Sequence, residues 1–208
     1  MKTVFVNPER CIGCKQCQIA CAVAHSMSKN IYGAVSERPT PRPRILVAPG
    51  LFLDTSFPNK CRHCDPAPCM AICPTGAISR DPELDIVVLD GHKCITCAMC
   101  AMVCPFDVLT FYPAISLETD KPVALKCDHC IERQKEGEIP ACVEACKVGA
   151  LVFGELNDMV KRARTQLAVQ VSSGVREIRA EQVGLPAQIS AWRALGESVS
   201  RAGKEVES

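Results

Sequence analysis

Sixteen cysteines, gathered in four groups of four, are the residues of this chain whose type and spacing could do chemistry. The four groups, in chain order, are Cys11, Cys14, Cys17 and Cys21; Cys61, Cys64, Cys69 and Cys73; Cys94, Cys97, Cys100 and Cys104; and Cys127, Cys130, Cys142 and Cys146. Thiolates at such short spacings bind soft metal ions, and thiols in an oxidising compartment pair as disulfides. Zinc sites, disulfides and iron–sulfur clusters are therefore the three kinds of site to compare.

Groups one and three have the compact spacing C-x2-C-x2-C-x3-C. Bacterial ferredoxins use this run to bind [4Fe–4S] clusters, with three thiolates on one cluster and the fourth on the other cluster of a pair. A structural zinc site takes four ligands in two close pairs and has no need of three cysteines at three-residue steps. The compact groups therefore favour iron–sulfur clusters over zinc.

Groups two and four have an extended spacing, in which an insertion displaces the third cysteine. Group four taken alone, C-x2-C-x11-C-x3-C, is also compatible with zinc. Yet "NKCRHC" at 59–64 parallels "LKCDHC" at 125–130, and "CPTGAI" at 73–78 parallels "CKVGAL" at 146–151. The repeat indicates that group four has the same role as group two.

Short strands and turns are predicted to position the cysteine groups. The segments "VFVNPERCIGC" at 4–14 and "VVLDGHKCITC" at 87–97 each predict a strand, a polar turn and a cluster-binding loop. The connector at 74–93, "PTGAISRDPELDIVVLDGHK", predicts a strand, a turn and a second strand between groups two and three. This connector favours pairing group two with group three and group one with group four. Spacing alone leaves open a sequential pairing of one with two and three with four.

Composition limits the other classes of protein. A net charge of +1 gives no support to a nucleic-acid binder, and the first ten residues have no export signal. No uncharged apolar stretch approaches the ~18 residues that a membrane helix needs. A cytoplasmic protein keeps its thiols reduced, which argues against eight disulfides. No nucleotide-binding or nucleophile motif is present, so we expect a non-catalytic cytoplasmic protein that reaches the inner membrane face only through a partner complex.

The cysteine groups and their repeats resemble the four-cluster iron–sulfur electron-transfer subunits found with formate dehydrogenases, dimethyl-sulfoxide reductases and hydrogenases. The resemblance covers about residues 1–155. The opening "MKTVFVNPERCIGCKQCQIACAVAHS" is more particularly similar to the ferredoxin-like subunit of nickel carbon-monoxide dehydrogenase systems. This implies an electron carrier with carbon-monoxide dehydrogenase as donor and a hydrogenase or FAD/NAD oxidoreductase as acceptor. A subunit of a formate dehydrogenase or hydrogenase complex is the alternative, and a zinc-bound structural module is the remote one.

The resemblance also implies the nested pairing and four [4Fe–4S] clusters, each with a definite ligand set. The implied sets are Cys11, Cys14, Cys17 and Cys146 for cluster 1; Cys21, Cys127, Cys130 and Cys142 for cluster 2; Cys61, Cys64, Cys69 and Cys104 for cluster 3; and Cys73, Cys94, Cys97 and Cys100 for cluster 4. The chain lacks the C-terminal membrane-facing segment of exported members, which puts quinone-side docking in doubt.

The expected fold is α+β, with two nested ferredoxin-like 2[4Fe–4S] units and C-terminal helices. Residues 1–60 and 114–155 would form the outer unit, 61–113 the inner unit, and 156–208 a helical extension. Two stripes of apolar residues at helical spacing predict two C-terminal helices. The first stripe is Leu156, Val160, Ala163, Leu167 and Val171, and the second, after Pro186, is Ile189, Trp192, Leu195 and Val199. These helices would pack on the cluster domain, or the second would be a partner-binding arm anchored by Trp192.

Three further sets of residues have two interpretations each. His63 and His129 would cover a cluster or face solvent, the alternative being a ligand or a proton-coupled redox tuner. Lys60 and Lys126 would raise a cluster potential or be solvated. The segment 36–50 would be a stiff surface connector or a docking loop for an acidic partner, through Arg38, Arg42 and Arg44.

Overall fold

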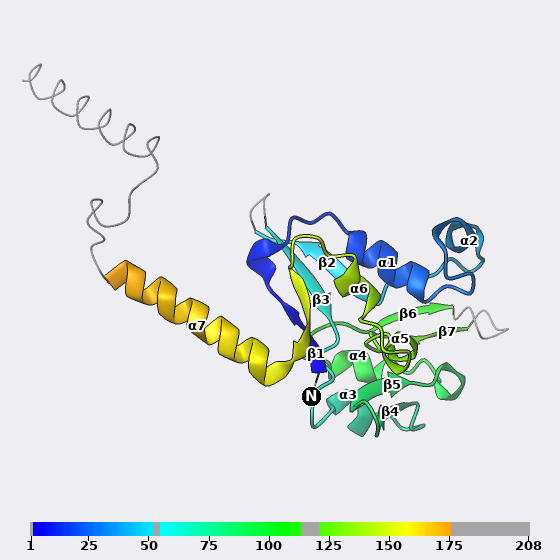
Figure 1. The fold of residues 1–208 in the computed structure, drawn as a ribbon. Coiled ribbons are helices and arrows are strands. Elements are labelled where there is room, and N and C mark those ends of the chain that lie inside the picture. Colours follow the sequence, from blue (N-terminus) through cyan, green and yellow to red (C-terminus); the bar gives the residue numbers. More distant parts are fainter. Residues whose placement is uncertain (1, 52–54, 114–120, 176–208) are drawn as a thin grey trace, which may run out of the picture. The chain divides into compact units, whose positions relative to one another are not determined.

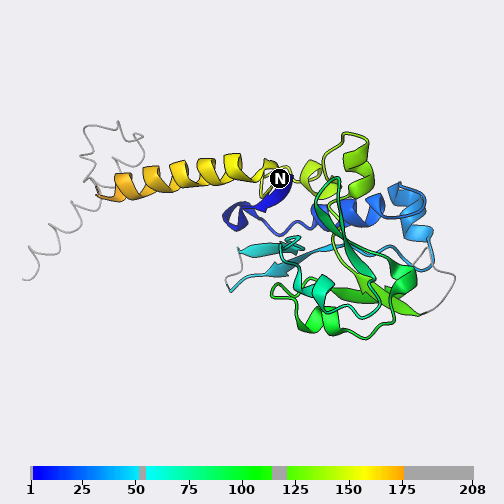
Figure 2. The same cartoon turned by 90° about the horizontal axis from the view of Figure 1, so that it is seen from below.

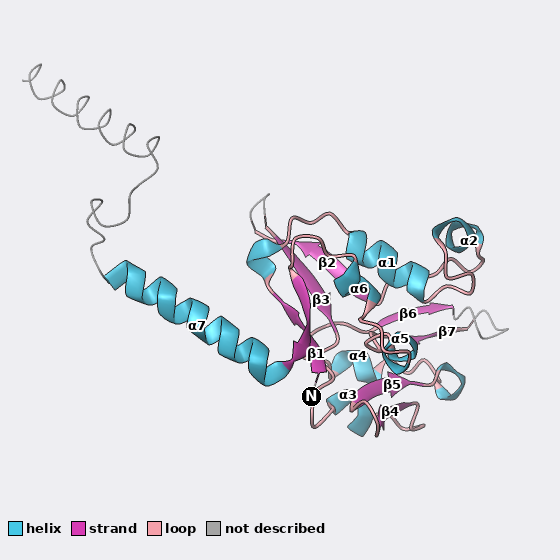
Figure 3. Ribbon diagram, viewed as in Figure 1, coloured by secondary structure: helices cyan, strands magenta, loops and turns pink. Residues whose placement is uncertain are grey.

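The computed structural model describes residues 2–51, 55–113 and 121–175 as a mixture of short helices and strands (Figures 1 and 3). The strands are β1 (Lys2–Val6), β2 (Ile45–Pro49), β3 (Ser56–Lys60), β4 (Ile78–Asp81), β5 (Ile86–Leu89), β6 (Thr110–Pro113), β7 (Pro122–Leu125) and β8 (Leu151–Glu155). The helices are η1 (Pro8–Arg10), α1 (Gln16–Ala24), α2 (Ile31–Ser36), α3 (Pro68–Ala71), η2 (Gly91–Lys93), α4 (Met99–Met102), α5 (Ile131–Lys135), α6 (Ala141–Glu144) and α7 (Leu156–Val175). The predicted mixed α and β composition is confirmed.

The chain divides into two compact units, residues 1–159 and 160–208. All sixteen cysteines belong to the first unit. The first predicted C-terminal helix is present as α7, while the second predicted stripe, 189–199, lies outside the described residues. Within the described ranges, no helix combines the length and the apolar composition that a membrane crossing requires. The further division into outer and inner units stays a prediction.

Four two-stranded antiparallel sheets connect the cysteine groups. Strand β1, before group one, pairs with β8, after group four, with Val4 opposite Phe153. Figures 1 and 2 show these two strands side by side, although about 150 residues separate them in sequence. Strands β4 and β5 connect groups two and three, and β6 and β7 connect groups three and four. The β1–β8 sheet therefore brings together the two ends of the cysteine region.

The strand and turn predicted before each compact group are present, and each turn is one turn of 3-10 helix. Strand β1 leads through η1 to Cys11, and Pro8 at the first helical position has the backbone angle that a helix start requires. Strand β5 leads through η2 to Cys94, where the Asp90 side chain accepts a hydrogen bond from the His92 amide at 3.0 Å. The two 3-10 turns, of which only η2 has a side-chain cap, set the direction in which each cluster loop leaves its strand.

Small aliphatic residues and cysteines form the core, in three clusters of buried side chains. The clusters are Val4, Cys21, Ile45, Cys142 and Leu151; Ala67, Ile78, Val87, Cys100 and Ala124; and Cys61, Val108 and Cys127. Among the described residues, no aromatic side chain is a fully buried member of these clusters, although the partly buried Phe153 and Phe111 pack against the first and second. The interior of the first unit is therefore organised around sulfur atoms, as the low aromatic content predicts.

Candidate functional site

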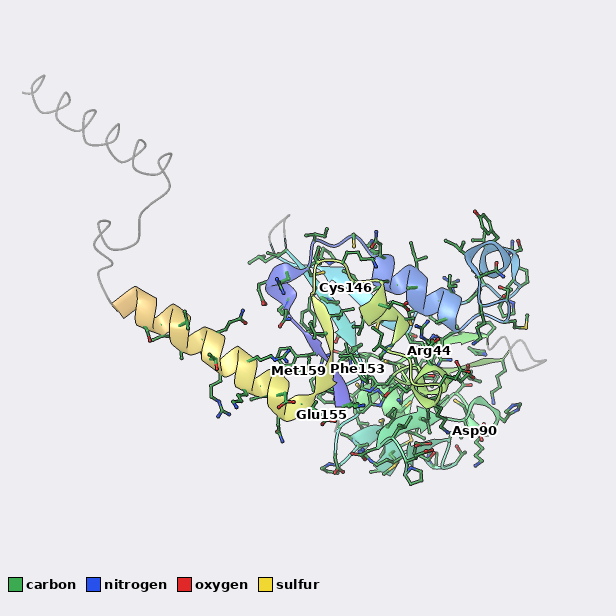
Figure 4. The ribbon with its side chains drawn as sticks, viewed as in Figure 1. Arg44, Asp90, Cys146, Phe153, Glu155 and Met159 are labelled. Carbon is green, nitrogen blue, oxygen red and sulfur yellow. The ribbon has the colours of Figure 1, made fainter. Side chains whose placement is uncertain are left out.

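One cavity is lined by four cysteines from the two ends of the cysteine region: Cys11, Cys14, Cys17 and Cys146. Cys17 lies on α1, and Cys146 lies between α6 and β8 (Figure 4). Burial raises the pKa of Cys17 to about 11, and the neighbouring thiols of Cys11 and Cys146 add to the rise. The β1–β8 sheet brings these cysteines together.

Two further cavities are lined by cysteines of groups two and three. One is lined by Cys61, Cys64, Cys69 and Cys104, and the other by Cys73, Cys94, Cys97 and Cys100. Each cavity takes three cysteines from one group and a single cysteine, the last of its group, from the other. Apolar side chains, including Val87, Leu89 and Val108, complete the walls and exclude water.

The fourth set, Cys21, Cys127, Cys130 and Cys142, lies in the interior. All four side chains are buried. Burial raises the pKa of Cys142, and the thiols of Cys127, Cys21 and Cys130 raise it further, which places the four groups near one another. The structure thus brings together the members of each predicted set, while their assignment as ligands of four separate clusters stays a prediction.

The first C-x-x-C segment of each of the four groups has the same left-handed backbone at the residue before its second cysteine. The φ angles are +69° at Gly13, +52° at His63, +62° at Thr96 and +55° at His129. Only group one has glycine there, and a Cβ at Gly13 would lie 2.6 Å from the Ser56 Oγ. The other three groups have His63, Thr96 and His129 at this position. A search for glycine would therefore find the left-handed conformation in group one alone.

Backbone amides donate hydrogen bonds to five cysteine sulfurs. The donors and acceptors are Arg44 to Cys21 at 3.2 Å, His63 to Cys61 at 3.4 Å, His129 to Cys127 at 3.4 Å, Leu151 to Cys146 at 3.4 Å and Ala124 to Cys94 at 3.5 Å. An N–H group directed at sulfur stabilises negative charge there, so these amides favour the thiolate that binds iron.

Two lysines and two histidines of the K-C-x-H-C repeats are buried between groups two and four. Lys60, His63, Lys126 and His129 are at most 3% exposed. The Lys60 Nζ lies 3.0 Å from the His129 Nε2, and the Lys126 Nζ lies 3.9 Å from the Cys61 Sγ, so each lysine contacts the other repeat. Burial lowers the pKa of Lys60, and burial together with the charge of Lys60 lowers the pKa of His129 to about 3. Solvated lysines and solvent-facing histidines are therefore wrong predictions.

A partly buried ion network beside the fourth set was not predicted. The Asp128 carboxylate accepts hydrogen bonds from the Arg44 Nη1 and from the His25 Nε2, the latter at 3.0 Å. Burial alone would raise the pKa of Asp128, but hydrogen bonding to His25 and the charges of His25 and Arg44 hold it well below its usual range. Arg44 (Figure 4) is therefore ion-paired within the chain, which disfavours the docking role predicted for it, and the docking of a partner by segment 36–50 stays a prediction.

Comparisons with known proteins identify iron–sulfur relatives of this chain. Residues 54–156 match the family model described as the 4Fe-4S dicluster domain. An "Iron-sulfur protein" of Rhodospirillum rubrum is 34% identical over 186 residues, which covers 86% of this chain and 95% of the relative. "Electron transport protein HydN" of Escherichia coli (strain K12) is 33% identical over 178 residues, covering 79% of this chain and 97% of the relative.

"Protein NrfC" of Escherichia coli (strain K12) is 36% identical over 152 residues, which is 71% of this chain, and the chain spans only 62% of that protein's length. A chain of the active-site complex BamBC of benzoyl coenzyme A reductase aligns at 24% identity over 88% of this chain and 98% of its own length; its TM-score of 0.36 is too low to carry an argument.

The donor sets fit the cofactor that these matches indicate. Four thiolates are the ligand complement of a [4Fe–4S] cluster, and buried ring nitrogens of His63 and His129 beside Cys127 have no partner within the described part of the chain. The matches favour [4Fe–4S] clusters over zinc and confirm the predicted ferredoxin-like fold class. By the identity and coverage of its relatives, the chain belongs to the family of iron–sulfur proteins that carry the 4Fe-4S dicluster domain.

Proposed function

We propose that this protein is a non-catalytic electron carrier with four [4Fe–4S] clusters, one in each cysteine set. The proposed ligands are Cys11, Cys14, Cys17 and Cys146; Cys21, Cys127, Cys130 and Cys142; Cys61, Cys64, Cys69 and Cys104; and Cys73, Cys94, Cys97 and Cys100. The observation that supports this proposal most is that three separate cavities are each lined by four cysteines drawn from two groups.

Contacts between neighbouring elements support an arrangement of the four proposed sets in a row. Helix α1 carries Cys17 of the first set and Cys21 of the second, one helical turn apart. Cys127 of the second set packs in one core cluster with Cys61 of the third. Contact between α3, which carries Cys69, and α4, which carries a cysteine of the fourth set, connects the last two. A bound [4Fe–4S] cluster supplies reversible one-electron transfer, so such a row conducts electrons.

The ends of the row lie nearest to the surface. Cys14 of the first set and Cys97 of the fourth are the two exposed cysteines, and all sixteen lie within the described residues. Ile12 and Ile95, each directly after the first cysteine of its group, are 68% and 52% exposed. These two surfaces are where we expect a donor and an acceptor to approach.

The proposed donor is carbon-monoxide dehydrogenase, and the proposed acceptor is a hydrogenase or an FAD/NAD oxidoreductase. The support for the donor is the resemblance of residues 1–26 to the subunit of nickel carbon-monoxide dehydrogenase systems. A formate dehydrogenase or hydrogenase complex is the alternative. We place the protein in the cytoplasm, with contact to the inner membrane face only through such a complex.

Anaerobic purification tests the cofactor. We expect a brown protein with about sixteen iron atoms per chain, bleached by dithionite, with cluster signals in electron paramagnetic resonance (EPR) spectra of the reduced protein. A colourless protein with stoichiometric zinc would overturn the proposal. Purification of the native complex, with identification of its subunits, separates carbon-monoxide dehydrogenase from formate dehydrogenase or hydrogenase as the partner.

The docking prediction now depends on Arg38 and Arg42, which are exposed. Replacing both with serine is expected to slow electron transfer from the native partner severalfold at low salt and to weaken its salt dependence, because these charges steer association. Stopped-flow reduction at two ionic strengths measures this effect, with Lys2→Ser, also an exposed cation, as the matched control. Equal rates for the double variant and the control would remove the docking role.

A further inference from the structure

Two buried histidines lie between the second and third cysteine sets. The rings of His63 and His129 are 4.0 Å apart, between centroids, and inclined by 47°. A ring nitrogen of each lies within 4.8 Å of the other and of the Cys127 Sγ, which belongs to the second set. His63 also lines the cavity of the third set. The pair therefore occupies the junction between two neighbouring sets.

The protonation of His63 follows from its backbone partner. The Val87 amide donates a hydrogen bond to the His63 Nδ1 at 3.1 Å, so this nitrogen is an acceptor and carries no proton. In such a ring the proton is on Nε2. The Nε2 atom is buried and has no hydrogen-bond partner among the described residues. His63 thus has one buried N–H donor left unused by the chain.

His129 reaches the same state through a different partner. Its Nε2 lies 3.0 Å from the Lys60 Nζ, which is a donor and also donates to the Cys61 carbonyl at 3.0 Å. When Lys60 is protonated its ammonium group can only donate, so in that state the His129 Nε2 accepts and the proton of the ring is on Nδ1. That Nδ1 is likewise buried and without a partner within the described ranges. The two repeats thus fix opposite tautomers, and each leaves one N–H free.

A buried donor without an acceptor is unfavourable, so each of these two N–H groups is expected to have an acceptor that is not part of the described chain. The acceptors that the cysteine sets would bring to this junction are cluster sulfides and cysteine sulfurs. We propose that His63 and His129 each donate this N–H to a cluster-bound sulfur and so raise the reduction potentials of the two central clusters. The inference rests on the proposed function, since it needs clusters in both sets.

The direction of the effect follows from charge. A reduced cluster carries one more negative charge than an oxidised one, so an N–H donor stabilises the reduced form more. The two histidines, being neutral donors, do this without adding a buried charge. Their expected effect therefore falls on the central step of electron transfer, between the clusters of the second and third sets.

Pulsed EPR on protein labelled with 15N-histidine tests the contact itself. We expect a 15N coupling to a cluster in its reduced state. This coupling should weaken in His63→Phe and in His129→Phe. At fixed potential, each variant should also lower the ratio of reduced to oxidised central cluster by about tenfold. His92→Phe is the matched control, because His92 is exposed and lies two residues before Cys94. Retention of the coupling and of the ratio in both iron-loaded variants would overturn the inference.

Glutamine variants are the second test, because glutamine keeps an N–H donor. His63→Gln and His129→Gln are expected to lose the histidine coupling but to keep a ratio closer to that of the unaltered protein. If both glutamine variants lower the ratio of reduced to oxidised cluster as far as the phenylalanine variants do, the proposed N–H donation to cluster-bound sulfur is contradicted. Iron content separates this failure from failure of the proposed function: protein without about sixteen irons contradicts the function, whereas full iron without coupling contradicts only the histidine contact.

Discussion

Replacing Cys146 with alanine is expected to affect the same cluster as Cys11→Ala does. In both variants this cluster is either lost or left with three irons. Both side chains line one cavity, and β1 and β8 hold the segments that carry them in register. Alanine offers no ligand atom, so the cluster loses one of its four thiolates and either dissociates or loses one iron. The effect reaches about a quarter of the total iron when the whole cluster is lost.

The measurement is a comparison of variants by EPR and Mössbauer spectroscopy, with iron counted in each. The matched control is Cys142→Ala, four residues earlier, which is expected to affect the cluster that Cys21→Ala affects. Under sequential pairing, Cys146 would complete the cluster begun at Cys94 instead. A signal shared by the Cys146 and Cys94 variants, and untouched in the Cys11 variant, would therefore contradict the nested assignment.

The nested arrangement of the cysteine segments was predictable because its signals are local or repeated. The strands before Cys11 and Cys94 follow from short apolar runs, and the structure has them as β1 and β5. The likeness of "NKCRHC" to "LKCDHC" related groups two and four across more than sixty residues. Spacing indicated which cysteines could share a loop, and the strand connector indicated which loops could share a unit.

The polar contacts around the cysteines were not predictable, because their partners are far apart in sequence. Lys60 and His129 are 69 residues apart, and Arg44 and Asp128 are 84 residues apart. No spacing or periodicity relates such pairs, and one sequence shows no covariation. Arg44 was grouped with Arg38 and Arg42 because the three share a Pro- and Arg-rich segment, although Arg44 is ion-paired with the partly buried Asp128 carboxylate.

The ion network at Asp128 has the largest expected effect on stability. In Asp128→Asn the amide keeps the shape of the side chain but loses the charge that compensates Arg44, whose side chain is only 24% exposed. The Arg44 Nε already has no partner within the described residues, so the guanidinium would be left with an uncompensated, half-buried charge. Removing one partner of a buried ion pair lowers the free energy of unfolding by roughly 3 kcal/mol or more. Because this pair is only partly buried, we expect a loss near that lower value.

Because iron–sulfur proteins lose their clusters irreversibly on unfolding, the rate of unfolding is the quantity to measure. Anaerobic bleaching of the visible absorbance in guanidinium is expected to be about a hundredfold faster for Asp128→Asn, if the network is broken in the transition state. Glu132→Gln is the matched control: its pair with Lys29 is 3.2 Å long but exposed, so its loss should cost at most about 1 kcal/mol. Equal bleaching rates for the two variants would mean that the Arg44–Asp128 pair contributes no more than a surface salt bridge. The insertion carrying Arg44 would then be held in place by other contacts, such as the hydrogen bond from the Arg44 amide to the Cys21 Sγ of group one.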